Sequence, residues 1–281
     1  MSTGRLTDDS EMTITIIRSL IRNRGYQRDD IVQSYLNWAN LPGNQTLGRN
    51  TRRLFKGVKT IKGYEKRYQQ VLAEPFDKRS QSNGPLMRCT PFALLPDLTA
   101  AYTDCMLTNP HPICLDANFT YITALKAALQ HKSRDEIWTQ VLATVQSDVL
   151  KKILQDVIIE PPVIYNVNQP NKGWVLYAFW CAMFCLYHYQ RAESSMNFPD
   201  YQSAIDFVIL LKGDTDTNAA ITGGLMGAVA GYDQMMAHER TNYNIRAIRS
   251  VDNTVGRKPK PAIYGIADFD WFTSEIVNIF V

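Results

Sequence analysis

Residues 213–232 of this 281-residue chain read GDTDTNAAITGGLMGAVAGY, an acidic turn followed at once by a glycine-rich helical pattern. A second acidic motif, TDDSEM at residues 7–12, also stands directly before a helical pattern. Carboxylates placed this close together repel one another unless a cation or hydrogen-bond donors compensate. Mg²⁺ and Mn²⁺ prefer such carboxylate and hydroxyl ligands. If the fold brings the two motifs together, they predict a two-metal site.

Either motif alone also fits a simpler interpretation. Asp, Ser and Thr before a helix are ordinary N-caps, and the helix dipole favours acidic residues there. The occurrence of two such motifs favours metal binding over capping. The second pattern also holds Gly223, Gly224, Gly227 and Gly231, although each glycine costs roughly 1 kcal/mol in a helix relative to alanine. We therefore expect another backbone to approach this helix closely.

Helical periodicity runs through most of the chain. Helices are predicted over residues 11–23, 29–39, 50–57, 64–73, 91–106, 115–131, 134–156, 174–190 and 201–212, and then over the glycine-rich segment. Residues 80–88 and 161–173 contain Gly and Pro and are predicted to be loops. Residues 242–255 are polar and unpatterned, 257–261 predict an exposed linker, and 269–280 are rich in aromatic residues. No run alternates as a strand does, so the sequence predicts an all-α fold.

The two acidic motifs resemble the N-terminal metal motif and the C-terminal signature of the ADP-ribosylglycohydrolases, with Ser10 where Thr is more usual. Three weaker matches lie between them in the family's order: LGRNTRRL at 47–54, SNGPLMRCTP at 82–91 and TNPHP at 108–112. The resemblance implies a single compact orthogonal helical bundle over residues 1–235. Residues 236–281 would form a C-terminal extension that either packs on this domain or meets a partner.

The resemblance also implies a metal site. Two Mg²⁺ or Mn²⁺ ions would be held beside the ribose carbon that loses its protein attachment, by Thr7, Asp8, Asp9, Asp214, Asp216 and Thr217. Asp8 and Asp9 are the residues expected to take part in catalysis. Divalent ions neutralise clustered carboxylates and lower the pKa of a bound water, and nearby carboxylates stabilise an oxocarbenium-like transition state.

Substrate binding is assigned by the same resemblance to Ser82, Asn83, Gly84, Asn109 and His111. Backbone N–H groups exposed by a glycine suit phosphate oxygens, whereas the simpler interpretation of residues 82–84 is a plain turn. Asn109 stands where the family often has a histidine beside the adenosine. His111 is either a shifted substitute for that histidine or a loop residue.

One family element is missing from the printed sequence. Family members usually begin with a glycine-rich helix carrying Gly-Asp-x-x-Gly, followed by a glutamate that resembles the catalytic or water-positioning acid. Only six residues precede Thr7, so either an upstream piece lies outside this sequence or the protein has lost the element. Glu11 is the nearest stand-in, although that position does not have this role in the family.

Three functions remain open at this point. The first is a Mg²⁺-dependent hydrolase that removes ADP-ribose from modified proteins or related ADP-ribosyl conjugates. The second is a degenerate module that binds ADP-ribose or metal without cleaving. The third is an interaction protein in which the acidic motifs only cap helices.

Composition restricts the class of partner. The content of 45% hydrophobic and 20% charged residues is that of a soluble globular protein. A net charge of +3 argues against nucleic acid, and the basic stretch at residues 49–67 fits either a solvated face or an anion-attracting surface. Residues 174–187 are apolar but too short to span a bilayer, and five cysteines without a signal segment fit a reducing compartment. We expect an intracellular, cytoplasmic protein with no membrane partner, and the sequence does not predict its oligomeric state.

Overall fold

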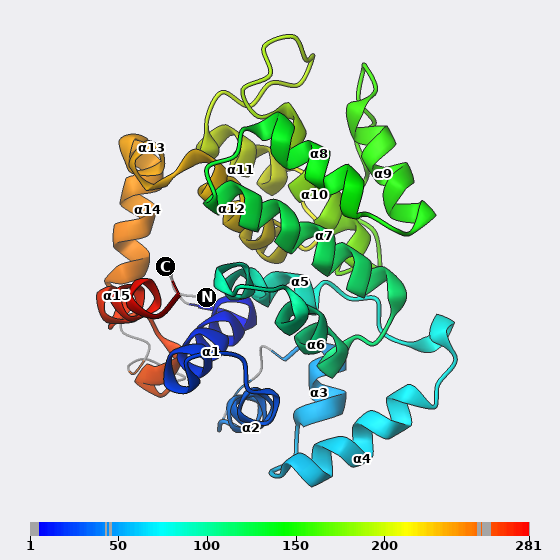
Figure 1. Ribbon diagram of the computed structural model, residues 1–281, viewed down its shortest axis with the longest axis vertical. Coiled ribbons are helices and arrows are strands. Elements are labelled where there is room, and N and C mark those ends of the chain that lie inside the picture. The colour runs from blue at the N-terminus through cyan, green and yellow to red at the C-terminus, as the bar shows by residue number, and fades with distance from the viewer. Residues whose placement is uncertain (1–5, 43, 45–46, 252–253, 255–259, 281) are drawn as a thin grey trace.

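The computed structural model describes residues 6–42, 44, 47–251, 254 and 260–280, and this part of the chain contains fifteen α-helices and no β-strand (Figure 1). The all-α prediction is confirmed. Three short 3₁₀ helices join the larger ones: η1 (Phe76–Lys78), η2 (Thr90–Leu94) and η3 (Ala262–Tyr264). The α-helices are α1 (Asp8–Asn23), α2 (Arg28–Ala39), α3 (Arg49–Phe55), α4 (Ile61–Leu72), α5 (Gly84–Arg88), α6 (Thr99–Thr108), α7 (Pro112–Leu129), α8 (Arg134–Thr144), α9 (Asp148–Ile158), α10 (Val175–His188), α11 (Tyr201–Leu210), α12 (Thr215–Ala230), α13 (Tyr232–Ala237), α14 (Glu239–Arg249) and α15 (Phe269–Phe280).

Helix α10 is the centre of the hydrophobic core. Every residue from Ala178 to Leu186 has 0% of its surface exposed, and the helix packs against α7, α9 and α12. The apolar run at 174–187 therefore lies inside the protein, as its sequence predicts. All five cysteines are buried with free thiols. None of the helices in the described part of the chain combines the length and the apolar character needed to cross a membrane.

The glycine-rich helix α12 packs between α10 and α11, but the expected close approach of another backbone is wrong in detail. A Cβ at Gly223 would lie 3.0 Å from the hydroxyl of Tyr201, and a Cβ at Gly224 would lie 3.0 Å from the hydroxyl of Tyr121. The glycines therefore make room for tyrosine side chains. Gly231 does not belong to the helix interior, because it ends α12 with a φ of +79°.

Several element boundaries differ from the sequence prediction for local reasons. Residues 80–88 are not all loop, because α5 begins at Gly84 with a proline in its first turn. The segment at 134–156 divides into α8 and α9, since Asp116 on α7 accepts hydrogen bonds from the backbone N–H groups of Gln146 and Ser147. Residues 91–106 divide between η2 and α6, and the polar segment after 238 forms α14.

The C-terminal helices α13 to α15 run along one side of the molecule (Figure 1). Helix α15 and η3 contact α1, and Arg18 on α1 donates to both carboxylate oxygens of Asp268, at 2.6 and 2.8 Å. Lys260 was expected in an exposed linker but is 8% exposed, because its Nζ donates to the buried Glu11 carboxylate at 2.5 and 2.6 Å. Residues 257–259 of that linker lie outside the described residues. The division of the chain at residue 235 stays a prediction.

Candidate functional site

The starts of α1 and α12 face the same cavity, which has a volume of about 560 Å³. The cavity wall also includes the start of α3, the segment leading into α5, and Gly173 before α10. Its lining residues are Asp8, Gly48, Arg49, Asn50, Thr51, Arg53, Lys78, Ser80, Ser82, Asn83, Gly84, Met87, Gly173, Asp214, Asp216 and Thr217. Two motifs that are about 200 residues apart in the sequence therefore meet, as the two-metal interpretation requires.

The first acidic motif does not cap its helix. Thr7 occupies the N-cap position of α1 but makes no capping hydrogen bond. Its hydroxyl instead donates to Oδ2 of Asp9 at 2.7 Å. The other carboxylate oxygen of Asp9 is buried and has no hydrogen-bond donor among the described residues. An unpaired buried carboxylate oxygen is costly, and a bound cation would offset that cost.

The second acidic motif also lacks a capping bond. Asp214 is the N-cap of α12 without a side-chain capping hydrogen bond, and its Oδ2 accepts from Nδ2 of Asn83 at 2.8 Å. Gly213 allows this turn, because its φ is +75° and a Cβ there would lie 2.5 Å from the carbonyl oxygen of Val167. Only glycine fits that combination of conformation and space.

The two motifs interact electrostatically. Burial raises the pKa of Asp8 to about 7, and the negative charges of Asp9, Asp216 and Glu11 act in the same direction. Burial likewise raises the pKa of Asp9, while the hydroxyls of Thr7 and Thr217 oppose that rise and Asp216 adds to it. Carboxylates that disfavour one another's charge in this way are stabilised by a bound cation. Asp216 itself is exposed at the cavity.

The predicted substrate loop also lines the cavity, beside the second acidic motif. Ser82, Asn83 and Gly84 all face it. The backbone N–H of Asn83 donates to the carbonyl oxygen of Gly173 at 2.9 Å, which joins the loop to the segment before α10. Because Asn83 also bonds Asp214, the loop and the second acidic motif are held together.

The other two predicted substrate residues do not line the cavity. Asn109 is 1% exposed and its amide nitrogen donates toward Ser80 and Ser82 at 3.1–3.3 Å. His111 is the N-cap of α7, where its Nδ1 accepts from the backbone N–H of Ile113 at 3.2 Å. Burial lowers the pKa of His111. Asn109 therefore hydrogen-bonds the loop from its buried side, and His111 caps the start of α7.

Sequence reasoning missed part of the cavity wall. Arg49, Asn50, Thr51 and Arg53 belong to the 47–54 motif, which was matched to the family but was not assigned to the site. The order of the family motifs was the available signal for these residues. Lys78 and Gly173 carried no such signal, because contacts across the fold bring them to the cavity.

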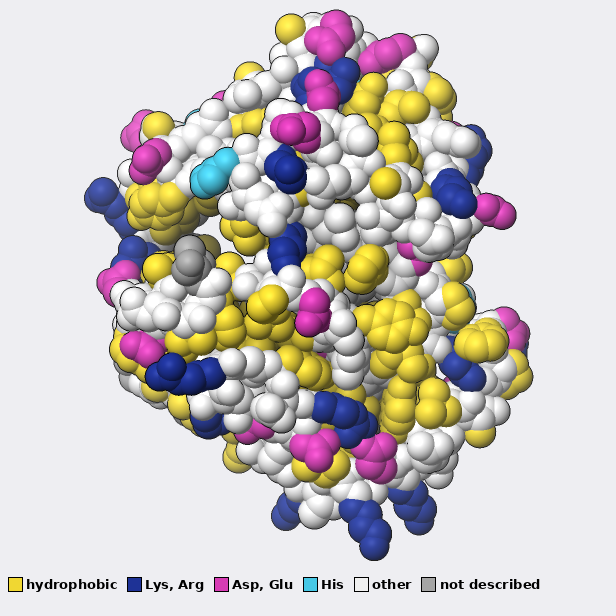
Figure 2. Space-filling view, in the orientation of Figure 1, with side chains coloured by type: hydrophobic (Ala, Val, Ile, Leu, Met, Phe, Trp, Pro, Cys, Tyr) yellow, Lys and Arg dark blue, Asp and Glu magenta, His cyan; other side chains and the backbone are white. Residues whose placement is uncertain are grey.

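The basic stretch divides into two kinds of side chain. Lys56 donates to the carbonyl oxygen of Ala39 at 3.1 Å, and Arg67 to that of Lys56 at 2.7 Å, so these cations are used within the protein. Arg49 lines the cavity and makes no ion pair with the described residues. In the space-filling view, Lys and Arg side chains stand among Asp and Glu side chains over most of the visible face (Figure 2).

A sequence model of the ADP-ribosylglycohydrolases matches residues 2–253 of the chain. The chain belongs to the ADP-ribosylglycohydrolase family. A curated protein of Acanthamoeba polyphaga mimivirus, whose name proposes an ADP-ribosyl glycohydrolase, is 28% identical in an alignment 257 residues long that covers 80% of this chain and 71% of that protein. A solved structure described as an ADP-ribosylglycohydrolase-related protein complex matches with a TM-score of 0.63 and 20% identity, over 99% of this chain and 83% of the other, and shows the shared fold.

Membership in the ADP-ribosylglycohydrolase family supports a hydrolase of ADP-ribosyl conjugates, with ADP-ribosyl groups as its ligand. The match covers all five sequence motifs. It extends beyond Gly231, to residue 253, and ends before Lys260. The contact between Lys260 and Glu11 is therefore made by a residue outside the matched region.

Proposed function

We propose that this ADP-ribosylglycohydrolase uses divalent cations, Mg²⁺ or Mn²⁺, to release ADP-ribose from modified proteins. The supporting observation is that both acidic motifs face one cavity and neither N-cap residue caps its helix. Helix capping alone would leave Thr7 and Asp214 bonded to the first-turn N–H groups. The capping-only function therefore has no support from the geometry.

The donor set suits a hard cation. Asp8, Asp9, Asp214, Asp216 and the hydroxyl of Thr217 supply oxygen ligands, and one Asp9 oxygen has no partner among the described residues. Among those residues, no group of three or more His, Cys, Asp or Glu side chains forms a ready metal cluster. Mg²⁺ keeps several waters and needs only one or two carboxylates per ion, so an open set of this kind fits it. When bound, such ions orient ribose hydroxyls and acidify a water.

The basic residues of the cavity suit the anionic part of ADP-ribose. Arg49 and Lys78 line the cavity, and neither pairs with a carboxylate of the acidic motifs within the described residues. Gly84 lines the same cavity. A diphosphate held by Arg49 and Lys78 would leave the ribose to the acidic residues.

A second candidate is a module that binds without cleaving, and one observation favours it. No glutamate is among the described residues that line the cavity. Glu11 is not a stand-in for the family's acid, because it is 1% exposed and its carboxylate is occupied by Lys260 and by the indole N–H of Trp38 at 2.8 Å.

The two candidates are separated by a substrate panel. Arginine-linked, serine-linked and polymeric ADP-ribose conjugates are incubated with the protein in Mg²⁺ and in EDTA, and released ADP-ribose is measured. Release that requires Mg²⁺ supports the hydrolase. Binding of ADP-ribose by calorimetry without release from any substrate selects the binding module.

The five unpaired buried thiols further support a reducing, cytoplasmic setting.

A further inference from the structure

The carboxyl end of α6 lies behind the cavity and is made of three buried polar residues, Asp104, Thr108 and Asn109, each 1% exposed. None of them lines the cavity. Buried polar groups are expensive unless they are fully hydrogen-bonded. Their partners therefore indicate what this polar cluster is for.

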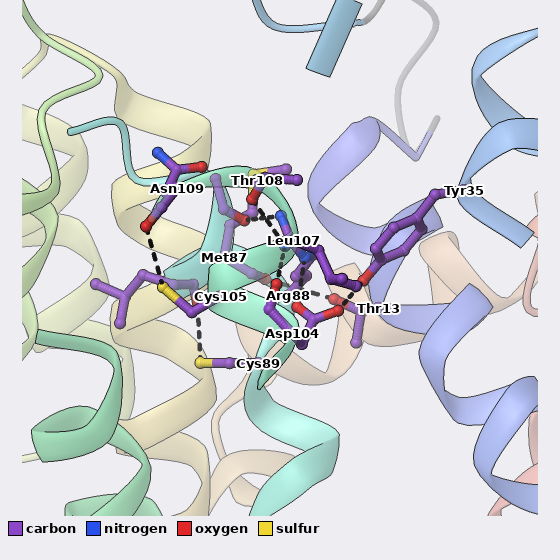
Figure 3. A network of polar contacts seen from close by, with 12 residues as sticks. Thr13, Tyr35, Met87, Arg88, Cys89, Asp104, Cys105, Leu107, Thr108 and Asn109 are labelled. Carbon is purple, nitrogen blue, oxygen red and sulfur yellow. Dashed lines mark hydrogen bonds and ion pairs between the residues drawn. The ribbon is translucent and has the colours of Figure 1, made fainter. Parts of the chain in front are cut away.

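Asp104 and Thr108 act on the substrate loop through Arg88 (Figure 3). The Arg88 Nε donates to Asp104 Oδ2 at 2.8 Å, and its Nη2 donates to the hydroxyl of Thr108 at 3.0 Å. Its Nη1 donates to the carbonyl oxygen of Gly84 at 3.1 Å. Tyr35 completes the cluster by donating to Asp104 Oδ1 at 2.8 Å. One guanidinium thus ties the first residue of α5 to α6.

Asn109 acts on two other cavity segments. Its Nδ2 donates toward the carbonyl oxygens of Ser80 and Ser82, at 3.1 and 3.3 Å. Its Oδ1 accepts from Nδ2 of Asn50 at 3.1 Å, and the same Asn50 nitrogen donates to the carbonyl oxygen of Thr108 at 2.7 Å. A side-chain amide can donate two hydrogens from its nitrogen and accept on its oxygen. A histidine at this position could not make the same set of bonds, because no single imidazole nitrogen donates two hydrogens.

We infer that the carboxyl end of α6 is the positioning unit for the ligand wall of the cavity, formed by residues 48–51 and 80–84. Asp104 acts through Arg88 on Gly84, and Asn109 acts on Ser80, Ser82 and Asn50. The acidic residues come from α1 and α12, and the Asn83–Asp214 hydrogen bond is the side-chain contact that joins them to this wall. The unit should therefore affect the affinity for the ligand more than the affinity for the cation. What the ligand is rests on the proposed function.

The test compares two variants with a matched control. Asn109→Leu removes every hydrogen bond of the amide at similar size, and Arg88→Lys keeps the charge beside Asp104 but cannot reach all its partners. His188→Leu is the control, because His188 is also a fully buried, hydrogen-bonded residue. It lies at the far end of α10 from Gly173, about 20 Å away along the helix.

Two measurements are made on each protein. Hydrogen exchange without ligand reports the backbone of residues 80–88, where the N–H of Asn83 is protected by Gly173. Calorimetry reports the Kd of ADP-ribose in Mg²⁺ and the Kd of Mg²⁺ alone. We expect Asn109→Leu to speed exchange in 80–88 and to weaken ADP-ribose about ten-fold or more, as loss of buried hydrogen bonds does. Arg88→Lys should act in the same direction, and in both variants the Kd of Mg²⁺ should change less than the Kd of ADP-ribose.

His188→Leu should lower stability without altering exchange at 80–88 or either Kd. The inference is overturned if folded Asn109→Leu and Arg88→Lys exchange residues 80–88 at the wild-type rate. It is also overturned if the Mg²⁺ and ADP-ribose affinities fall together, because the effect is then a general loosening. If the wild type binds neither Mg²⁺ nor ADP-ribose, the proposed function fails, while the exchange measurement still decides the role of α6.

Discussion

Replacing Asp8 by asparagine should stabilise the protein when no divalent cation is bound. Burial holds the folded pKa of this carboxyl at about 7, against an ordinary value of 3.8. Between these values the folded state keeps a proton that the unfolded state has lost, so stability falls as pH rises through that window. A gap of about 3 pH units corresponds to roughly 4 kcal/mol once both states are ionised. Asparagine has nearly the same shape and cannot ionise, so Asp8→Asn should recover about 2–4 kcal/mol at pH 8.

The assay is urea unfolding in EDTA at pH 4, 6 and 8, followed by circular dichroism. The difference between Asp8→Asn and wild type should be under about 1 kcal/mol at pH 4 and should grow with pH. Saturating Mg²⁺ should stabilise the wild type and not the variant, because a ligand of the folded state adds to its stability. Glu193→Gln, on an exposed ion pair, should change little at any pH. A variant less stable than wild type at pH 8 in EDTA, or a difference independent of pH, would refute the reasoning.

Three further changes test other parts of the account. Lys260→Met should cost about 3–5 kcal/mol in urea unfolding, because it leaves the buried Glu11 carboxylate without a counter-charge. The Glu11→Gln/Lys260→Met double variant should recover most of that loss, and equal instability of the two proteins would contradict the ion pair. Gly213→Ala should lower stability by about 1–3 kcal/mol and weaken Mg²⁺ binding, since the φ of Gly213 is +75° and Val167 leaves no room for a Cβ. If the variant binds Mg²⁺ with the wild-type Kd, the turn at Gly213 does not position a cation ligand. Arg49→Ala should weaken ADP-ribose binding and reduce its salt dependence. The control Lys62→Ala, at an exposed residue of α4 that does not line the cavity, should do neither. If the two variants bind ADP-ribose alike, Arg49 is not part of the ligand wall.

The helical fold could be predicted because its signals are local. The meeting of the two acidic motifs, about 200 residues apart, was a condition of the metal-site interpretation and was supported by the resemblance to the family. Each motif combines closely spaced carboxylates with the start of a helix. The glycines of α12 have a low helix propensity, so their presence in a helix indicates that a neighbouring group approaches closely. The run at 174–187 is likewise recognisable from its own composition as an apolar helix too short to span a bilayer. What the sequence could not show was the identity of the groups that fill the space beside α12, which are Tyr121 and Tyr201 rather than a backbone.

The role of Asn109 could not be predicted because its partners are distant in sequence. Its amide bonds Ser80 and Ser82, nearly thirty residues earlier, and Asn50, about sixty residues earlier, so only the folded chain shows that it contacts the loop and does not line the cavity. Lys260 is a sharper example. It stands in a charged, proline-containing segment typical of a linker, yet it pairs with Glu11 across the length of the chain. A buried ion pair of this kind leaves no local pattern.

The most direct test of the central claim is release of ADP-ribose from a panel of modified substrates by wild type, Asp8→Asn and Asp216→Asn, each in Mg²⁺ and in EDTA. The account predicts release by the wild type in Mg²⁺ only, with both variants losing cation binding and activity while remaining folded. Activity of the wild type that persists in EDTA, or full activity of both variants, would contradict a cation site built from the two acidic motifs.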